Sequence, residues 1–157
     1  MDSPMYLLIH VLISVLGIIS GLVVAGGMAC GRLLGGWNGY FLATTVLTSA
    51  TGFGFPFVKV LPPHIVGAIS LVVLAVCLFA LYAKQLAGGW RKIFVITAMV
   101  ALYLNVFVLV VQLLQKTPPL AKLAPEGSPV FGITHLVVLG LMGWLGWAAF
   151  KGFKDAK

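Results

Sequence analysis

Long apolar runs separated by short polar stretches dominate the chain. A helix needs about 20 apolar residues to cross a ~30 Å hydrocarbon core, because each residue advances about 1.5 Å. Four segments meet this requirement without a charged residue: residues 5 to 28, 64 to 83, 93 to 114 and 130 to 150. The pattern therefore predicts an all-α fold, a polytopic transmembrane helix bundle in which residues 1 to 157 form one integral membrane domain.

A further segment, residues 38 to 57, is uncharged but rich in threonine, serine and glycine. Thr44, Thr48 and Thr51 recur at helical spacing, and hydroxyl groups can bond to the preceding turn of their own helix. The segment can therefore be a fifth span, although its hydropathy is lower than that of the other four.

The distribution of positive charge favours five spans. With the N terminus outside and the C terminus inside, seven lysines and arginines lie inside and three outside; in a four-span alternative with both termini inside, the division is six against four. In membrane proteins with short loops, an excess of lysine and arginine on the inner side sets the orientation. This excess is larger in the five-span arrangement. The five-span arrangement also puts every tryptophan near the inner boundary, where this residue is common: Trp37, Trp90, Trp144 and Trp147.

Composition excludes a soluble domain. Only 8% of the residues are charged and 61% are hydrophobic, whereas a soluble domain carries about a quarter charged residues. The net charge of +7 lies in loops and the tail, so we interpret it as inner-side bias and attraction to membrane lipids, with no nucleic acid as partner.

The five-span arrangement brings three histidines and a glutamine into the outer leaflet. His10 is about one turn into the first span, His64 begins the third, and His135 is about six residues into the fifth. Gln112 lies near the outer end of the fourth span, seven residues after Asn105 and so on the same face. Tyr6 and Thr51 are expected nearby. Polar side chains at this depth usually face the protein interior and are often functional.

Two interpretations of this cluster stay open. His10, His64, Gln112 and His135 can bind a cofactor, either haem b, a chlorophyll-type pigment or a quinone, and His10 with His135 can ligate a metal, since neutral imidazole is the commonest metal ligand. Alternatively, these side chains make hydrogen bonds between helices, each worth about 0.6 kcal/mol. The sequence contains no short motif for haem or metal binding.

Small residues mark two expected packing faces. Gly17, Gly21 and Ala25 recur every fourth residue in the first span, and Gly140, Gly143 and Gly146 recur every third residue in the last. Faces of this kind allow helices to approach closely in lipid.

The string "GRLLGGWNGYFLATTVLTSATGFGFPF", with "LPPHIVGAISL", "ALYLNVFVLVVQ" and "LAP", resembles a group of small, uncharacterised bacterial inner-membrane proteins. The resemblance covers most of the chain and implies a multi-pass protein of the bacterial inner (cytoplasmic) membrane. It supplies no activity and no catalytic residue. Members of the group often carry glutamine at the position of His135, which argues against obligatory ligation there.

Chemistry that needs acidic or nucleophilic groups is not apparent. The three acidic residues, Asp2, Glu126 and Asp155, all lie outside the apolar runs, and no Ser-His-Asp set, HExxH or CxxC occurs. We therefore expect a non-enzymatic protein. The first interpretation is an accessory or structural subunit that packs against a larger respiratory or photosynthetic complex or against a second copy of the chain. The alternative is a haem-, pigment- or quinone-binding electron-transfer protein, and the third is a small channel or transporter.

Overall fold

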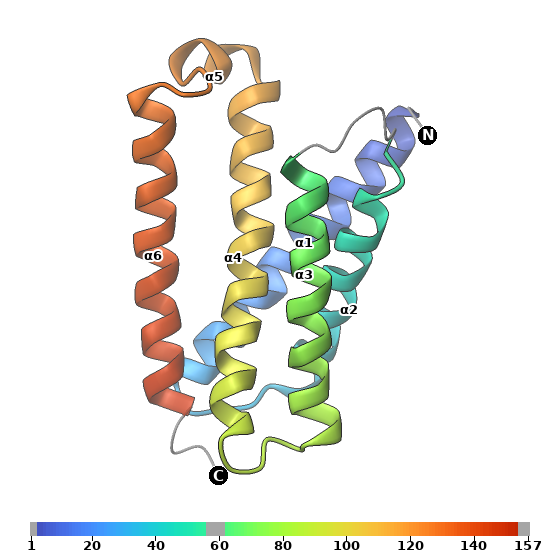
Figure 1. Ribbon diagram of the computed structural model, residues 1–157, viewed down its shortest axis with the longest axis vertical. Coiled ribbons are helices and arrows are strands. Elements are labelled where there is room, and N and C mark those ends of the chain that lie inside the picture. Colours follow the sequence, from blue (N-terminus) through green and yellow to red (C-terminus); the bar gives the residue numbers. More distant parts are fainter. Residues whose placement is uncertain (1–2, 56–61, 154–157) are drawn as a thin grey trace.

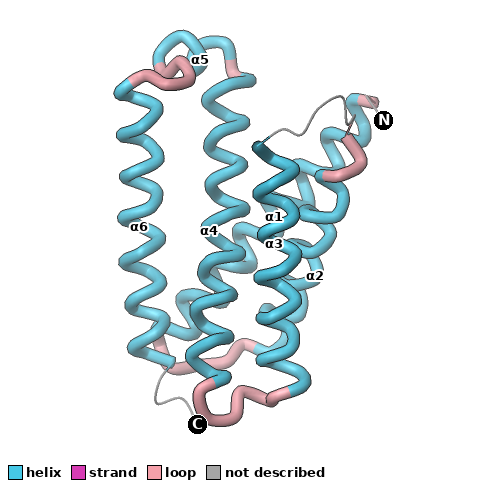
Figure 2. The backbone as a smooth tube through the Cα atoms, in the orientation of Figure 1, coloured by secondary structure: helices cyan, strands magenta, loops and turns pink. Residues whose placement is uncertain are grey.

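The chain folds into a bundle of long helices. The computed structural model describes residues 3–55 and 62–153, and every regular element within these residues is helical (Figure 1, Figure 2). The predicted all-α fold is therefore confirmed. In chain order the elements are α1 (Pro4–Ala29), α2 (Gly35–Gly52), α3 (Pro62–Leu78), the π-helical turn η1 (Phe79–Ala83), α4 (Trp90–Lys116), α5 (Pro118–Leu123) and α6 (Pro129–Phe153).

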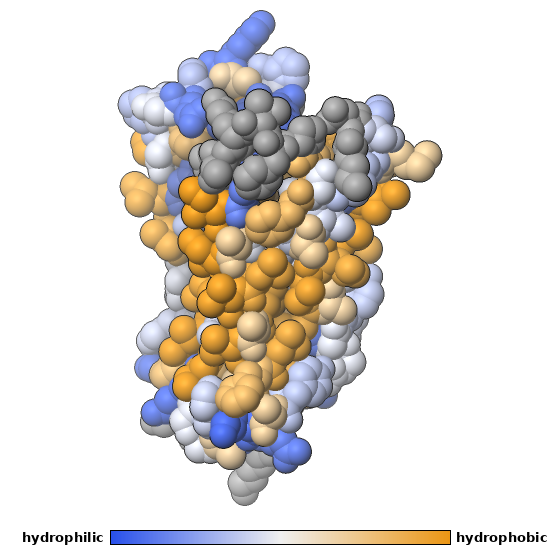
Figure 3. Space-filling view, turned by 45° about the vertical axis from the view of Figure 1, so that its right-hand side comes forward, coloured by the Kyte–Doolittle hydropathy of each residue, from blue (hydrophilic) through white to orange (hydrophobic). Residues whose placement is uncertain are grey.

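Within residues 3–55 and 62–153, four helical stretches are long and apolar enough to cross a membrane. They are Pro4–Ala29, His64–Ala83, Trp90–Lys116 and Pro129–Phe153, which correspond to the four uncharged segments predicted from hydropathy. Figure 3 shows a broad band of hydrophobic side chains between hydrophilic ends on one face of the molecule. Together the four helices indicate an integral membrane protein.

The segment predicted at 38–57 also forms a helix, α2, but with shifted bounds. It begins at Gly35 and ends at Gly52, and residues 56 and 57 lie outside the described residues. α2 is not among the four helices selected by length and hydropathy, because threonine, glycine and asparagine lower its apolar character. It runs antiparallel beside α1, with Thr51 next to Tyr6 and Leu34 next to Gly27.

The helices are arranged around a tilted α1. This helix has 26 residues and is about 39 Å long at 1.5 Å per residue, so it exceeds a ~30 Å hydrocarbon core unless it is inclined. Figure 1 shows α1 running diagonally across the bundle, from the side of α2 at its N-terminus toward the lower end of α6. α3 packs against both α2 and α4, while α6 packs against α4 and the end of α1.

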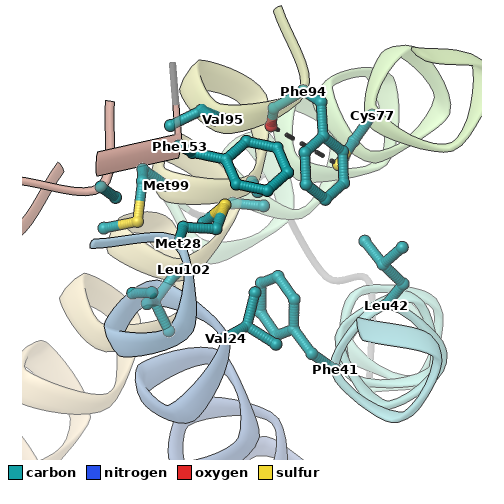
Figure 4. Packing of buried hydrophobic residues seen from close by; sticks show 14 of the residues in the cluster. Val24, Met28, Phe41, Leu42, Cys77, Phe94, Val95, Met99, Leu102 and Phe153 are labelled. Atoms are coloured by element: carbon teal, nitrogen blue, oxygen red, sulfur yellow. Dashed lines mark hydrogen bonds between the residues drawn. The ribbon is translucent and has the colours of Figure 1, made fainter. Parts of the chain in front are cut away.

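The hydrophobic core occupies one half of the bundle. We call this the packed half; it contains the C-terminal half of α1 and the N-terminal half of α4, and the opposite half is the open half. Figure 4 shows Phe41, Phe94 and Phe153 filling the space between the helices, together with methionine and aliphatic side chains. Apart from alanines, the most deeply buried members of this core are Val24, Met28, Phe41, Leu42, Leu74, Cys77, Phe94, Val95, Leu102 and Phe153.

The small-residue face of α1 lies inside the bundle. A methyl group added at Gly21 would lie 2.6 Å from a Leu102 methyl group and 2.8 Å from the Phe41 ring, distances too short for carbon atoms. At Gly17 it would meet the hydroxyl groups of α2 at 3.2 to 3.4 Å, and Ala25 is completely buried. These residues therefore let α1 approach α2 and α4 closely.

The glycines of α6 are placed differently. A methyl group at Gly140 or Gly143 would meet no atom of the described residues within 4 Å, and one at Gly146 would reach only Met99, at 3.8 Å. The buried residues of this 25-residue helix are Ala149 and Phe153, both near its C-terminal end. Most of the predicted glycine seam of α6 therefore faces outward, because α6 meets the rest of the bundle mainly in the packed half.

This contrast predicts opposite outcomes for two matched substitutions. Gly21→Leu should lower the free energy of unfolding by at least about 1–3 kcal/mol, the usual cost of overpacking a core. Gly140→Leu should leave it unchanged or raise it by up to about 1 kcal/mol, since leucine is the better helix former. Thermal unfolding of both variants in the same mild detergent measures the difference. Equal destabilisation of the two variants would contradict the arrangement of α1 and α6.

Candidate functional site

A cavity of about 440 Å³ lies in the open half, between α1, α2, α3 and α4. Its size falls in the range of ordinary small-molecule sites, about 300–1,000 Å³. Apolar side chains form most of its wall, and none of the lining residues that the structure describes is acidic. Its polar lining residues are His10, Ser14, Thr48, Ser49, His64, Ser70, Asn105, Gln112, Lys116 and Thr117.

Helical spacing explains how one helix supplies polar groups at several depths. Asn105, Gln112 and Lys116 are separated by seven and four residues, so they lie on one face of α4. From Asn105 to Lys116 the backbone of α4 advances about 16 Å at 1.5 Å per residue. Asn105 therefore marks the floor of the cavity, and Lys116 marks its rim at the end of the helix.

Hydrogen bonds from α1 to Thr51 hold one wall of the cavity together. The Tyr6 hydroxyl donates to the Thr51 carbonyl oxygen at 2.6 Å, and Nδ1 of His10 lies 2.8 Å from the Thr51 hydroxyl oxygen. That hydroxyl already donates to the Leu47 carbonyl oxygen at 2.7 Å. It can therefore only accept from His10, which places the proton of a neutral imidazole on Nδ1 and leaves Nε2 as an acceptor.

A second interhelical bond lies at the floor. The Ser14 hydroxyl donates to Oδ1 of Asn105 at 2.7 Å, and both side chains are buried. This bond joins α1 to α4 at the level where the two helices cross. It uses the acceptor of the Asn105 amide and leaves its Nδ2 donor for another group.

Unpaired polar atoms are concentrated at this cavity. Among the described residues, five buried side-chain atoms have no hydrogen-bond partner, and those of Thr48, Asn105 and Gln112 belong to residues that line it. A buried polar group without a partner costs about 1–3 kcal/mol. A molecule in the cavity that offered both donors and acceptors would remove this cost.

His64 lines the same cavity from the first turn of α3. Its side chain is 7% exposed, and its ring packs against Phe53 with a centroid distance of 6.2 Å. Three of the four residues predicted as an outer cluster, His10, His64 and Gln112, therefore line one cavity, with Tyr6 and Thr51 beside it.

His135 is separate from this group. Its Nδ1 donates to the Phe131 carbonyl oxygen at 2.8 Å, and its ring packs against Phe107 and Phe131. The N-terminal halves of α1 and α6 lie on opposite sides of the bundle (Figure 1), because α1 leans toward α2 in the open half. The structure thus does not bring His135 to His10, and no group of three or more metal-ligating side chains forms among the described residues.

Part of the lining was not predicted from the sequence. Ser49, Ser70 and Asn105 are not among the predicted cluster residues, although Asn105 forms the cavity floor. The usable signal for Asn105 was its seven-residue spacing from Gln112. The two serines gave no such signal, since serine is common in membrane helices without a ligand.

Comparison with known proteins identifies no relative: no protein-family model, no curated protein and no solved structure matches the chain.

Proposed function

We propose that α2 is a fifth membrane span and that the cavity lies in the outer leaflet of a bacterial inner membrane. α2 has 18 residues, about 27 Å at 1.5 Å per residue, which is close to the hydrocarbon thickness. It runs beside α1 from Gly27 to His10. The hydroxyls of Thr44, Thr45 and Thr51 donate to carbonyl oxygens of their own helix at 2.7 Å, so these groups are satisfied in lipid. The orientation rests on the charge bias, and the bacterial location on the resemblance.

A thiol test distinguishes five spans from four. Cys30 is exposed at the end of α1, which is inside if α2 spans and outside if it does not. Lys122 lies in α5, at the other end of the bundle, and is outside in both arrangements. In intact cells a membrane-impermeant maleimide should leave Cys30 unlabelled and should label Lys122→Cys. Labelling of Cys30 in cells with an intact inner membrane would contradict the five-span arrangement.

The cavity best supports binding of a quinone-type molecule. The observation that carries this proposal is the gathering of unpaired polar atoms from Thr48, Asn105 and Gln112 around one mostly apolar cavity. A quinone ring fits apolar walls, and its carbonyl oxygens can accept from Nδ2 of Asn105 and the hydroxyl of Thr48. The reduced form carries hydroxyl groups, which can donate to Oε1 of Gln112 and to Nε2 of His10. The same lining therefore suits both redox forms.

Metal-tetrapyrrole binding has less support. Ligation by His10 and His135 needs both imidazoles at one site, and they lie on different sides of the bundle. A continuous channel also has less support, since the buried core fills the packed half below the cavity.

Binding can be measured with a decyl-benzoquinone as probe. A ligand that binds only the folded state stabilises it by about 2.7 kcal/mol at one hundred times its Kd, so the protein in lipid nanodiscs should gain thermal stability as the probe is added. Gln112→Leu and His10→Leu should each raise Kd by roughly two- to twelvefold, equivalent to one hydrogen bond of about 0.5–1.5 kcal/mol.

His135→Leu is the matched control, because it removes a histidine in the open half that does not line the cavity. Its Kd should equal that of the wild type. No stabilisation by the probe, or equal weakening by all three substitutions, would overturn the proposal. A haem absorption band in the purified protein would do so as well.

A second role, as an accessory subunit, is favoured by the exposure of α6. Leu136, Leu141 and Trp144 are each more than 60% exposed, and glycine faces normally pack against another helix. If α6 binds a partner subunit or a second copy, Gly140→Leu should reduce the mass of the particle purified in mild detergent without lowering its stability.

Gly26→Leu is the control for this test, since Gly26 is also without neighbours within 4 Å but lies on α1. An unchanged particle mass for Gly140→Leu would count against the accessory role.

A further inference from the structure

The cavity is bounded by four helices that pack against one another in chain order. α1 packs along α2, α2 packs on α3, and α3 packs along α4. The fourth seam, between α4 and α1, is closed at the level of Ser14 and Asn105, where the two helices cross. Beyond this level α1 leans toward α2, as its bonds to Thr51 show, and so diverges from α4 (Figure 1).

The side chains along this fourth seam both line the cavity and reach the molecular surface. Leu7 and Val11 on α1 are 39% and 38% exposed, and Leu113 on α4 is 49% exposed. All three are apolar, and they lie within helices long enough to cross a membrane. Apolar surface exposed within such helices is suited to contact with lipid.

Polarity increases from this rim toward the floor of the cavity. Ser14 and Asn105 are each 8% exposed, and Ser70 is 5% exposed. A molecule placed with its polar ring at the floor and an apolar chain at the rim would match this gradient. The reverse orientation would leave the unpaired amide of Asn105 against hydrocarbon.

On the basis of the proposed quinone site, we infer that the opening between α1 and α4 is a lateral portal to the bilayer. The ligand is a membrane-resident quinone with a long apolar tail. Its ring lies at Asn105, Thr48 and Gln112, and its tail passes between Val11 and Leu113 into the lipid. The length of the tail is then not limited by the 440 Å³ of the cavity.

A series of benzoquinones with one ring and different tails tests the portal. The tailless compound, the decyl compound and a compound with a long isoprenoid tail are each measured against the protein in nanodiscs by thermal stabilisation. When Kd is expressed as a concentration in the membrane, each tailed compound should have a Kd no higher than that of the tailless compound. Binding of the tailless compound alone would overturn the portal and leave the proposed function standing. Failure of all three compounds would overturn both.

Bulky substitutions at the rim provide a second test of the portal. Val11→Trp and Leu113→Trp should raise Kd for the long-tailed compound roughly tenfold more than they raise Kd for the tailless compound. The matched control is Leu136→Trp, at a position 67% exposed on α6 and away from the cavity; it should change neither value. An unchanged Kd for the long-tailed compound in both rim variants, with thermal stability preserved, would overturn the portal.

Discussion

The close crossing of α1 over α2 and α4 determines the shape of the whole bundle. From Ser14, which bonds to Asn105, to Gly21, whose backbone packs against the side chains of Phe41 and Leu102, α1 lies close to α2 and α4. Two rigid, inclined helices that touch at one level must diverge away from it. On one side of the crossing the divergence is filled by large side chains such as Phe94 and Phe153. On the other side the lining includes small residues, and the cavity lies there: Ser14, Ser49, Gly52, Gly67 and Ser70.

The positions of the membrane helices could be predicted from the sequence because hydropathy acts locally. A run of about 20 apolar residues is sufficient to identify a span whatever its neighbours are. The small-residue face of α1 was predictable for a similar reason, since spacing alone places Gly17, Gly21 and Ala25 on one side. The helical state of α2 followed from spacing as well, although its bounds shifted.

The candidate site was only partly predictable, because it depends on the tilt of each helix and on which neighbour it meets. Residue spacing gives neither. Helical periodicity shows that His10 and His135 each have an inward face, but it does not show which neighbour that face meets. The tilt of α1 carries His10 toward α2 and away from α6. His135 instead packs against Phe107 of α4. The glycine run of α6 illustrates the same limit, since glycine permits close approach without specifying a partner.

The packed half also affects the route by which protons reach the cavity. Phe41 and Leu102 close the floor beneath Ser14 and Asn105, and they are only 1% exposed. These apolar side chains separate the cavity from the other end of the bundle. Protons taken up or released by a quinone in the cavity would therefore have their direct route to the solution on the open side. The fold gives any redox chemistry there a fixed sidedness.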